Sequence, residues 1–440
     1  MSAKHASWLE IDLARLDENL AAWRSVLGES GPPAGPEKSP GAEPAGYASP
    51  GICAVVKADA YGLGAVAIAH RLSGRGIDML AVYSSEQARE LLAGGLNCPI
   101  LLLMPIRDIP RADPLYRLAV AGRLHLTVHD PAHAGHLAAL GRRFGTRLAV
   151  HIYLDTGMSR GGVRPEQFKK TLFTILNESK LRLAGVATHF ATAQSDPAFV
   201  AEQMERFEQT VAPHRDDLPD DCLTHAAGTF AALRSQRYHG DMVRLGLGLY
   251  GYGTDLLEGE APGLDSLPQI RPILRWVSSL VHVERFPAGA TVGYDRTHTL
   301  ERDSILGLVP VGFADGYPLA LSDRAQVEVR PGTEPASPQR PMPAPVIGRV
   351  SMDQIVVDLT DLSSNDDGST VGPGTRVDLL SNDPASPCAL PRLAQQAGSH
   401  CYELLCRLSN RLPRVHVRTQ FSQPNPTRLR RFSATSPVRA

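Results

Sequence analysis

Hydrophobic residues recur along the first half of the chain in short runs that alternate with amphipathic stretches. Stretches with helical periodicity include 85–92, 131–140, 165–176 and 199–210. Strand-like runs that alternate with helices form parallel sheets, and eight of them close a (β/α)8 barrel of the TIM type, which is the α/β fold we predict here. The eight runs are ICAVVK (52–57), MLAVY (79–83), ILLLM (100–104), LHLTV (124–128), LAVHIYL (148–154), LRLAGVATH (181–189), CLTHA (222–226) and MVRLGLGLYG (242–251).

The pattern changes after about residue 263. Helical periodicity largely disappears, except near 390–398, and strand-like runs recur between Gly, Pro, Asn and Asp residues. We expect residues 12–263 to form the barrel and 264–419 to form a second, mainly β domain, which residues 1–11 would join as a strand. The strand-like runs are ILRWVSSLVHVERF (273–286), SILGLVPVGF (304–313), AQVEVR (325–330), PVIGRV (345–350), QIVVDL (354–359) and TRVDLL (375–380).

Three stretches are poor in residues that could form a core. Residues 29–51 and 331–345 are rich in Pro, Gly, Ala and Ser, and we interpret both as surface insertions. Residues 420–440 carry several arginines and no acidic residue, which predicts a disordered basic tail. Such a tail could touch RNA or a membrane, or could simply be a solvated end of the chain.

Composition narrows the classes of protein that remain. With 440 residues, 43% of them apolar, the chain is too long for one ordinary core. The 45 basic residues nearly balance the 46 acidic ones, so a nucleic-acid partner is not expected. Six scattered cysteines without a C-x-x-C pair predict reduced thiols in a cytoplasmic protein, neither disulfides nor a metal site. We find no secretory signal and no apolar run of about 20 residues, so no membrane partner is expected.

Residues capable of chemistry stand where the predicted barrel strands end. Active sites of this fold lie at the carboxyl ends of the strands. The first strand ends in Lys57, whose amine could form a Schiff base or could merely extend to water. Arg160 follows the fifth strand in a glycine-flanked loop, and His189 ends the sixth. Taken alone, His189 could also be a structural histidine.

The last two strands suggest a phosphate site. Loops after strands seven and eight commonly bind phosphate in this fold. Thr229 offers a hydroxyl there, and Gly246 and Leu247 offer backbone N–H groups, which need no net charge. Arg244 lies in the eighth strand and could equally be a salt-bridged strand residue.

Several motifs, in one order along the chain, resemble the alanine racemase family. The segment AVVKADAYG (54–62) is similar to the lysine signature of that family, which binds pyridoxal phosphate (PLP). The resemblance covers about Trp8 to Val417, without the insertions and the tail. The other motifs are WLEIDL (8–13), LDTGMSR (154–160), VGFADGYP (311–318), GRVSMDQ (348–354) and YELLCRLSNRLPR (402–414).

The resemblance implies a role for each candidate residue. Lys57 would hold PLP as a Schiff base, Arg244 would face the pyridine nitrogen and His189 would lie against the ring. Arg160 would orient the phenolic side of the cofactor and the second tyrosine, and it would bind the substrate. That tyrosine, Tyr294, would be a second base, and Met352 would contact the substrate. The phosphate would be held by Tyr61, Thr229, Gly246, Leu247 and Tyr402. Because Tyr294 and Met352 reach a partner's active site in this family, a head-to-tail homodimer is implied.

These residue types suit racemisation of an amino acid. The Cα proton must leave from one face and return on the other, so each face needs a base. PLP would carry the carbanion charge, Lys57 would serve the D-substrate and Tyr294 the L-substrate. A tyrosine ordinarily has a pKa of about 10, so it needs a nearby positive charge, for which Arg160 is the candidate. Arginine keeps its proton, so Arg244 would leave the pyridine a weaker electron sink, which favours racemisation over transamination.

Four positions depart from the family pattern. Leu63 replaces a histidine after the lysine motif, and Tyr153, after Ile152, stands where many members have a lysine that supports the arginine. The usual A-N-S turn is A-G-T at 227–229, and Asp295 replaces a glycine beside Tyr294. Asp295 could raise the pKa of Tyr294 or narrow the path of the substrate.

The sequence leaves other functions open. A racemase of serine or another small amino acid would share the same residues, because pockets discriminate only modestly between side chains that differ by one small group. A decarboxylase of the same architecture would need residues around a distal amine that we do not find. A non-catalytic PLP-binding protein would not need the β domain with Tyr294 and Met352. D-alanine supply for peptidoglycan is the cellular role that the resemblance suggests.

Overall fold

The computed structural model of the chain describes residues 6–28, 49–258, 269–331, 341–362 and 371–418. Most of the insertion expected at 29–51 and all of the tail expected at 420–440 lie outside these residues. Of the insertion expected at 331–345, only the two ends are described. The boundaries predicted for the domains stay predictions.

The first part of the chain forms a sheet of eight parallel strands in the order β8-β7-β6-β5-β4-β3-β2-β9. Backbone hydrogen bonds from Asp241 N to Thr224 O (2.8 Å) and from Arg244 N to Ala227 O (2.9 Å) bring the two outermost strands together, so the sheet curls into a barrel. The prediction of a (β/α)8 barrel is confirmed. The strands are β2 (Gly51–Val55), β3 (Met79–Val82), β4 (Ile100–Leu102), β5 (Leu124–Val128), β6 (Leu148–Tyr153), β7 (Leu181–Ala187), β8 (Leu223–His225) and β9 (Met242–Leu245).

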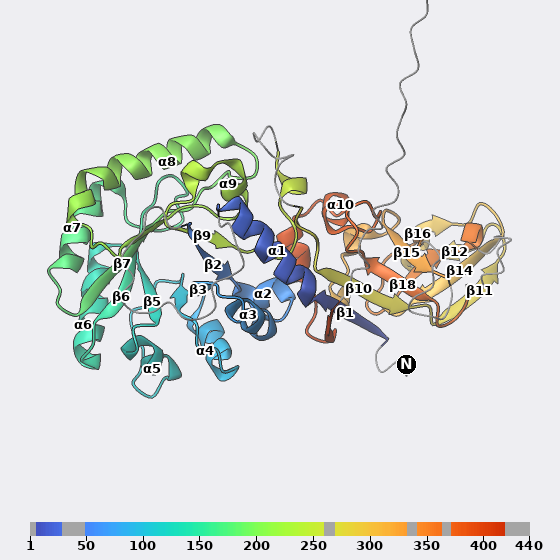
Figure 1. Cartoon of the computed structure of the whole chain (residues 1–440). Helices are drawn as coiled ribbons and strands as arrows, with labels where there is room; N and C mark the ends of the chain where they lie inside the picture. Colours follow the sequence, from blue (N-terminus) through green and yellow to red (C-terminus); the bar gives the residue numbers. More distant parts are fainter. Residues whose placement is uncertain (1–5, 29–48, 259–268, 332–340, 363–370, 419–440) are drawn as a thin grey trace, which may run out of the picture.

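Helices surround the barrel (Figure 1). Many begin at an aspartate whose carboxylate accepts backbone N–H groups of the first turn, as Asp130 does from His133 N (2.7 Å), and proline often follows directly. The helices are α1 (Leu13–Val26), α2 (Lys57–Gly62), α3 (Ala65–Ser73), α4 (Ser85–Ala93), α5 (Pro114–Val120), α6 (Pro131–Phe144), α7 (Pro165–Leu176), α8 (Pro197–Val211) and α9 (Thr229–Arg234). None of the helices within the described ranges is long and apolar enough to cross a bilayer.

The second part forms a nine-stranded sheet in the order β11-β14-β17-β16-β15-β18-β10-β1-β19. The N-terminal strand β1 lies between β10 and β19 in this sheet, so the chain starts in the β domain before it enters the barrel. The elements are β1 (Ser7–Asp12), β10 (Leu274–Ser279), β11 (His282–Phe286), β14 (Ser304–Val309), β15 (Gln326–Arg330), β16 (Met342–Ile347), β17 (Ile355–Asp358), β18 (Arg376–Leu380), β19 (Arg414–Val417), the small hairpin β12 (Thr291–Val292) and β13 (His298–Thr299), and helices α10 (Leu390–Gln396) and α11 (Cys401–Cys406).

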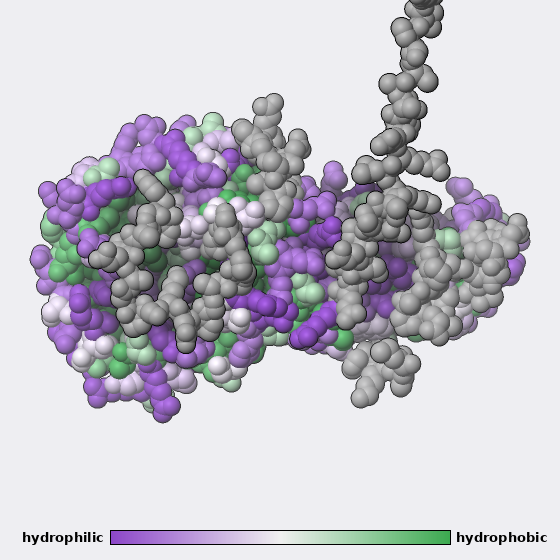
Figure 2. Space-filling model, in the orientation of Figure 1, coloured by the Kyte–Doolittle hydropathy of each residue, from purple (hydrophilic) through white to green (hydrophobic). Residues whose placement is uncertain are grey.

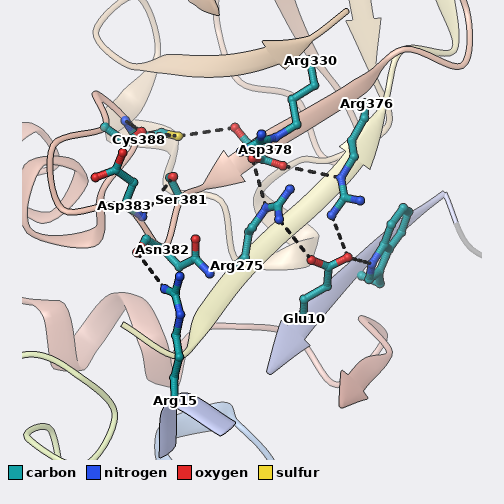
Figure 3. A network of polar contacts seen from close by, with 12 residues as sticks. Glu10, Arg15, Arg275, Arg330, Arg376, Asp378, Ser381, Asn382, Asp383 and Cys388 are labelled. Carbon is teal, nitrogen blue, oxygen red and sulfur yellow. Dashed lines mark hydrogen bonds and ion pairs between the residues drawn. The ribbon is translucent and has the colours of Figure 1, made fainter. Parts of the chain in front are cut away.

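A polar network fixes β1 in this sheet (Figure 3). The buried carboxylate of Asp378 lies 2.7 Å from Arg330 Nε and 3.1 Å from Arg275 Nε. Arg376 reaches the carboxylate of Glu10 on β1 at 2.6 Å. Because an unpaired buried carboxylate is costly, the three arginines hold β10, β15 and β18 in register around it.

Helix α1 connects the barrel to the β domain. Asn19 donates to Leu249 O (3.0 Å) and to Arg271 O (2.9 Å), and it accepts from Arg271 N (2.8 Å). Arg15 donates to Pro272 O (3.0 Å) and Asn382 O (3.2 Å). Hydrophilic residues cover most of the described surface that is visible in Figure 2, on both parts of the molecule.

Several predicted elements differ from those observed. The eighth strand stops at Leu245, because glycines at 246 and 248 begin a tight turn. The run 273–286 is two strands, β10 and β11. Strand β16 begins at Met342, inside the expected insertion: Pro343 and Pro345 alternate with Met342 and Ala344, and all four stand opposite residues of β15. A second helix, α11, follows α10 where we expected one helix.

Candidate functional site

Lys57 stands at the carboxyl end of β2, at the start of an unusual turn. The next four residues, 58–61, have φ values between 52° and 60°, which is the left-handed region. Left-handed backbone costs roughly 1–2 kcal/mol for each residue with a side chain. The turn is held by Asp59 Oδ1, which accepts from Ala65 N (2.6 Å), and by Arg414, which donates to Gly62 O (2.9 Å). The turn that follows Lys57 thus holds Tyr61 in a backbone conformation that local preferences disfavour.

The ammonium of Lys57 lies in a positively charged environment. Burial, followed by the charges of Arg160 and Arg244, lowers the pKa of Lys57 below its ordinary value. Arg160 is exposed and forms no ion pair with a described residue. An amine with a lowered pKa is neutral more often near neutral pH, and only the neutral amine is a nucleophile or a base.

Arg244 lies on β9 at the bottom of the site. Its guanidinium donates to Thr188 O (2.6 Å), His225 O (2.8 Å) and Ala226 O (3.0 Å). Nδ1 of His189 lies 3.1 Å from NH2 of Arg244. Burial and then Arg244 lower the pKa of His189 to about 3, so the imidazole is neutral at physiological pH. A fixed cation and a neutral ring therefore face the same space as Lys57.

The loops after β8 and β9 bring polar groups together beside Tyr61. A Cβ at Gly246 would lie 2.3 Å from the Tyr61 hydroxyl, so only glycine permits this approach. Thr229 Oγ1 accepts from Gly248 N (3.1 Å), and its helix α9 starts there. The Tyr402 ring meets the Tyr61 ring edge-on, with centroids 5.6 Å apart. Two hydroxyls and nearby backbone N–H groups suit a phosphate.

The structure does not bring Tyr294 and Met352 to this site. Both belong to the β domain, where they are 68% and 57% exposed. Tyr294 directly follows β12, which lies at the end of the β domain remote from the barrel (Figure 1). Within one chain, the predicted site residues therefore form two groups.

The loop that carries Met352 is held by surrounding residues. Backbone N–H groups of Phe313 and Ala314 donate to Ser351 O and Met352 O, both at 3.0 Å. Arg411 donates to Asp315 Oδ1 (2.6 Å) and to Asp353 Oδ1 (2.7 Å). The motifs at 311–318, 348–354 and 402–414 thus meet in one place. Arg411 lies in the last of these motifs, but no role for it was predicted from the sequence.

The positions that depart from the family pattern have well-defined contacts. Leu63 is fully buried. The Tyr153 ring stacks on His129, with centroids 5.3 Å apart. Gly228 forms a β-bridge with Arg244. Asp295 forms an ion pair with Arg349.

Known proteins are similar to this chain over most of its length. The profile described as "Alanine racemase, N-terminal domain" matches residues 45–254, and that of the C-terminal domain matches 273–416. The alanine racemase of Halothermothrix orenii is 32% identical, covering 93% of this chain and 96% of its own length. That of Desulfovibrio desulfuricans is also 32% identical, covering 93% and 98%.

Solved structures of alanine racemases are similar to this chain in fold as well. The alanine racemase of Streptomyces lavendulae superposes with a TM-score of 0.76 at 26% identity and covers 94% of this chain and 98% of its own. That of Streptomyces coelicolor has a TM-score of 0.76 at 28% identity, with the same coverage. Both matching profiles and full-length relatives above 30% identity agree, so the chain belongs to the alanine racemase family.

Proposed function

We propose that this chain interconverts L-alanine and D-alanine with PLP bound at Lys57 and with two bases, Lys57 and Tyr294. The observation that carries the proposal is the group formed by Lys57, His189 and Arg244 at the carboxyl ends of β2, β7 and β9, next to the close approach of Tyr61 to Gly246. The residues that would hold PLP are Lys57, Tyr61, His189, Thr229, Arg244, Gly246, Leu247 and Tyr402.

The residues present fit PLP. The close approach of the Tyr61 hydroxyl to Gly246, beside Thr229, offers uncharged donors of the kind that hold a phosphate. Arg244 cannot accept a proton, so it can face a pyridine nitrogen only as a donor. Lys57 supplies the amine that a carbonyl cofactor requires. When bound, PLP would delocalise the negative charge that forms at the substrate Cα.

Lys57 would move a proton on one face of the substrate. Burial and the charges of Arg160 and Arg244 lower the pKa of Lys57, so its amine can accept a proton from Cα and return it. Arg160, exposed and without an acidic partner among the described residues, is available to bind a carboxylate. The neutral ring of His189 adds no charge beside the pyridine ring.

The second base would come from a second copy of the chain. Tyr294 cannot reach its own barrel, but it is exposed on the β domain, as are other apolar side chains of that domain. These are Phe313 (45% exposed), Leu319 (44%) and Met352 (57%). Phe313 and Met352 stand on segments that are joined by backbone hydrogen bonds, and exposed apolar side chains on neighbouring segments are typical of a protein interface. A head-to-tail homodimer would cover them and place Tyr294 opposite Lys57.

We further propose that the protein acts in the cytoplasm and supplies D-alanine for peptidoglycan. The six cysteines are all unpaired, which suits a reducing compartment. This cellular role would depend on turnover of alanine, which the following experiment measures.

The test is an absorbance spectrum of the purified protein before and after borohydride reduction, followed by turnover of L-alanine and L-serine. A band near about 420 nm that reduction fixes onto Lys57, together with formation of D-alanine, is the expected result. D-serine as the main product would retain the mechanism and change the substrate. No band after addition of PLP would overturn the proposal.

A Tyr294→Phe variant separates an enzyme from a PLP-binding protein without catalysis. The variant should keep the cofactor band and lose conversion of L-alanine to D-alanine, since the phenol is the proposed base on one face. A carrier protein would show no turnover in either form. Sedimentation of the wild-type protein should give the mass of a dimer.

A further inference from the structure

Three histidines cross the interior of the barrel on β5, β6 and β8, and the proposed function gives them no role. His125, His151 and His225 are 8%, 0% and 2% exposed. Nδ1 of His125 lies 2.8 Å from Nε2 of His151, whose Nδ1 lies 2.9 Å from Nε2 of His225. Nδ1 of His225 lies 2.7 Å from NH1 of Arg244. The three rings therefore form a line that ends at the buried arginine.

The direction of each hydrogen bond follows from the arginine. A guanidinium only donates, so Nδ1 of His225 must accept and the His225 proton resides on Nε2. That N–H donates to Nδ1 of His151, which places the His151 proton on Nε2 as well. The Nε2–H group of His151 donates in turn to Nδ1 of His125, which is the last acceptor of the chain. All three histidines are thus neutral Nε2–H tautomers, in agreement with the lowered pKa of each buried ring.

Arg244 needs such a chain because its charge has no counterion. It is 7% exposed, and no carboxylate in the described part of the chain forms an ion pair with it. A buried charge without a partner is strongly unfavourable. A neutral imidazole presents the negative end of its dipole at the unprotonated nitrogen, and hydrogen bonds in a chain polarise one another. Three aligned rings therefore stabilise the guanidinium without neutralising its charge.

The barrel backbone makes space for the middle ring. A Cβ at Gly185 on β7 would lie 2.3 Å from Nδ1 of His151, so no other residue fits opposite this imidazole. The pairing of β6 with β7 also shifts register between Val150 and His151. A glycine and a shift of strand register at the same point indicate that the backbone is shaped to accommodate the His151 ring.

We propose that His125, His151 and His225 form a directional hydrogen-bond chain that holds Arg244 and sustains its charge, and that His125 is a positioning residue for the reaction. The proposal rests on the proposed place of Arg244 opposite the pyridine nitrogen. Loss of the last acceptor would leave the His151 N–H unsatisfied. The opposite tautomers would then point an N–H of His225 at Arg244 and displace the guanidinium.

The test uses two variants of the full-length protein. In His125→Asn, the amide oxygen can still accept from His151, whereas His125→Leu removes the acceptor. His136→Leu is the matched control, since His136 is exposed on α6 and bonds only to Ala132 O of its own helix. The first measurement is the tautomer of each barrel histidine by ¹⁵N NMR of histidine-labelled protein, with and without PLP.

We expect Nε2–H tautomers at all three rings of the wild type, and the same at His225 in His125→Asn. His125→Leu should change the tautomer of His225 and lower kcat about fivefold, the effect of one net hydrogen bond, with KM unchanged. A wild-type ring that is protonated or carries its proton on Nδ1 would overturn the proposal, whether or not the Leu variant folds. So would equal kcat in the Leu variant and the wild type.

The two proposals can fail separately. Correct tautomers in a protein that does not racemise alanine would refute the proposed function alone. Racemisation with any other tautomer pattern would refute the histidine chain alone.

Discussion

The carboxylate of Asp295 forms an ion pair with the guanidinium of Arg349, and this contact joins the turn of Tyr294 to the loop of Met352. Asp295 has a φ of 59°, a conformation that aspartate tolerates better than most residues. The negative charge of Asp295, next to Tyr294, is therefore paired with the positive charge of Arg349. The aspartate that replaces the usual glycine therefore links the turn of Tyr294 to the loop of Met352. These are the two side chains that the β domain would offer to a second copy of the chain.

Breaking this ion pair should lower activity modestly. In Asp295→Asn, the backbone conformation remains accessible but the charge is lost, so the Tyr294 turn should be held less firmly. We expect kcat to fall by up to about fivefold, because both side chains are largely exposed. The measurement is kcat in both directions for Asp295→Asn, Arg349→Gln and the double variant. Additive effects in the double variant would contradict the link, since paired residues act as a unit.

Replacement of Gly246 by alanine should weaken cofactor binding. The new Cβ would lie 2.3 Å from the Tyr61 hydroxyl, which must move away from the proposed phosphate site. We expect the Kd for PLP to rise about tenfold or more, as when a well-placed charge-assisted hydrogen bond is lost. Titration of the cofactor-free protein with PLP, followed by absorbance, gives this value.

The control for that variant is Gly135→Ala. A Cβ at Gly135 on α6 meets no atom within 4 Å, so only helix propensity changes. This variant should bind PLP as the wild type does and gain up to about 1 kcal/mol of stability. Equal PLP affinity in both variants would show that the space beside Tyr61 does not hold the phosphate.

Arg160→Gln should raise the pKa of Lys57. Burial comes first among the causes that lower the pKa of Lys57, and Arg160 comes second, so removal of this charge leaves the ammonium more stable. Only the neutral amine reacts with PLP, so the variant should reach a given rate of PLP attachment at a higher pH than the wild type does. The measurement is the rate of appearance of the cofactor band against pH. Arg164→Gln, which removes an exposed arginine paired with Glu166, should leave the profile unchanged.

Arg411→Met should destabilise the β domain. The Asp315 side chain is 7% exposed, and both of its oxygens bond to Arg411. Because the Arg411 side chain is 46% exposed, solvent screening reduces the loss to about 1–3 kcal/mol. Denaturant unfolding measures this loss. Arg407→Met removes only a surface ion pair with Glu403 and should change stability by less than about 0.5 kcal/mol.

Periodicity predicted the barrel well because its strands are buried on both faces. The run 100–104 has no polar residue, and every residue of 124–128 is buried although His125 and Thr127 alternate with apolar residues. The helices between the strands carry aspartate caps and prolines. Lys57, His189 and Arg244 could be placed at one end of the barrel because parallel strands all have their carboxyl ends on the same side. What remained open was how each side chain is held.

The sequence could not predict features that arise from contacts between distant segments. In the left-handed turn after Lys57 only Asp59 and Gly62 tolerate this backbone locally, and Arg414 supports the turn from the other end of the chain. The histidines of β5, β6 and β8 looked like ordinary strand residues, because only the closed barrel aligns them. The one local signal was Gly185 within a strand.

Buried histidines should make the protein sensitive to acid. The group consists of His125, His129, His133, His151, His189, His225 and His239, and burial lowers the pKa of each. In the folded chain the pKa falls to about 4 for His125 and His129 and to about 3 for His189, whereas unfolded histidine titrates near about 6.5. Unfolding therefore takes up protons as the pH falls below about 6.5, and the free energy of unfolding should decrease by up to about 1.4 kcal/mol per pH unit for each of these histidines. Denaturant unfolding between about pH 7.5 and 5 measures the slope, and a flat profile would mean that the histidines are not neutral in the folded barrel.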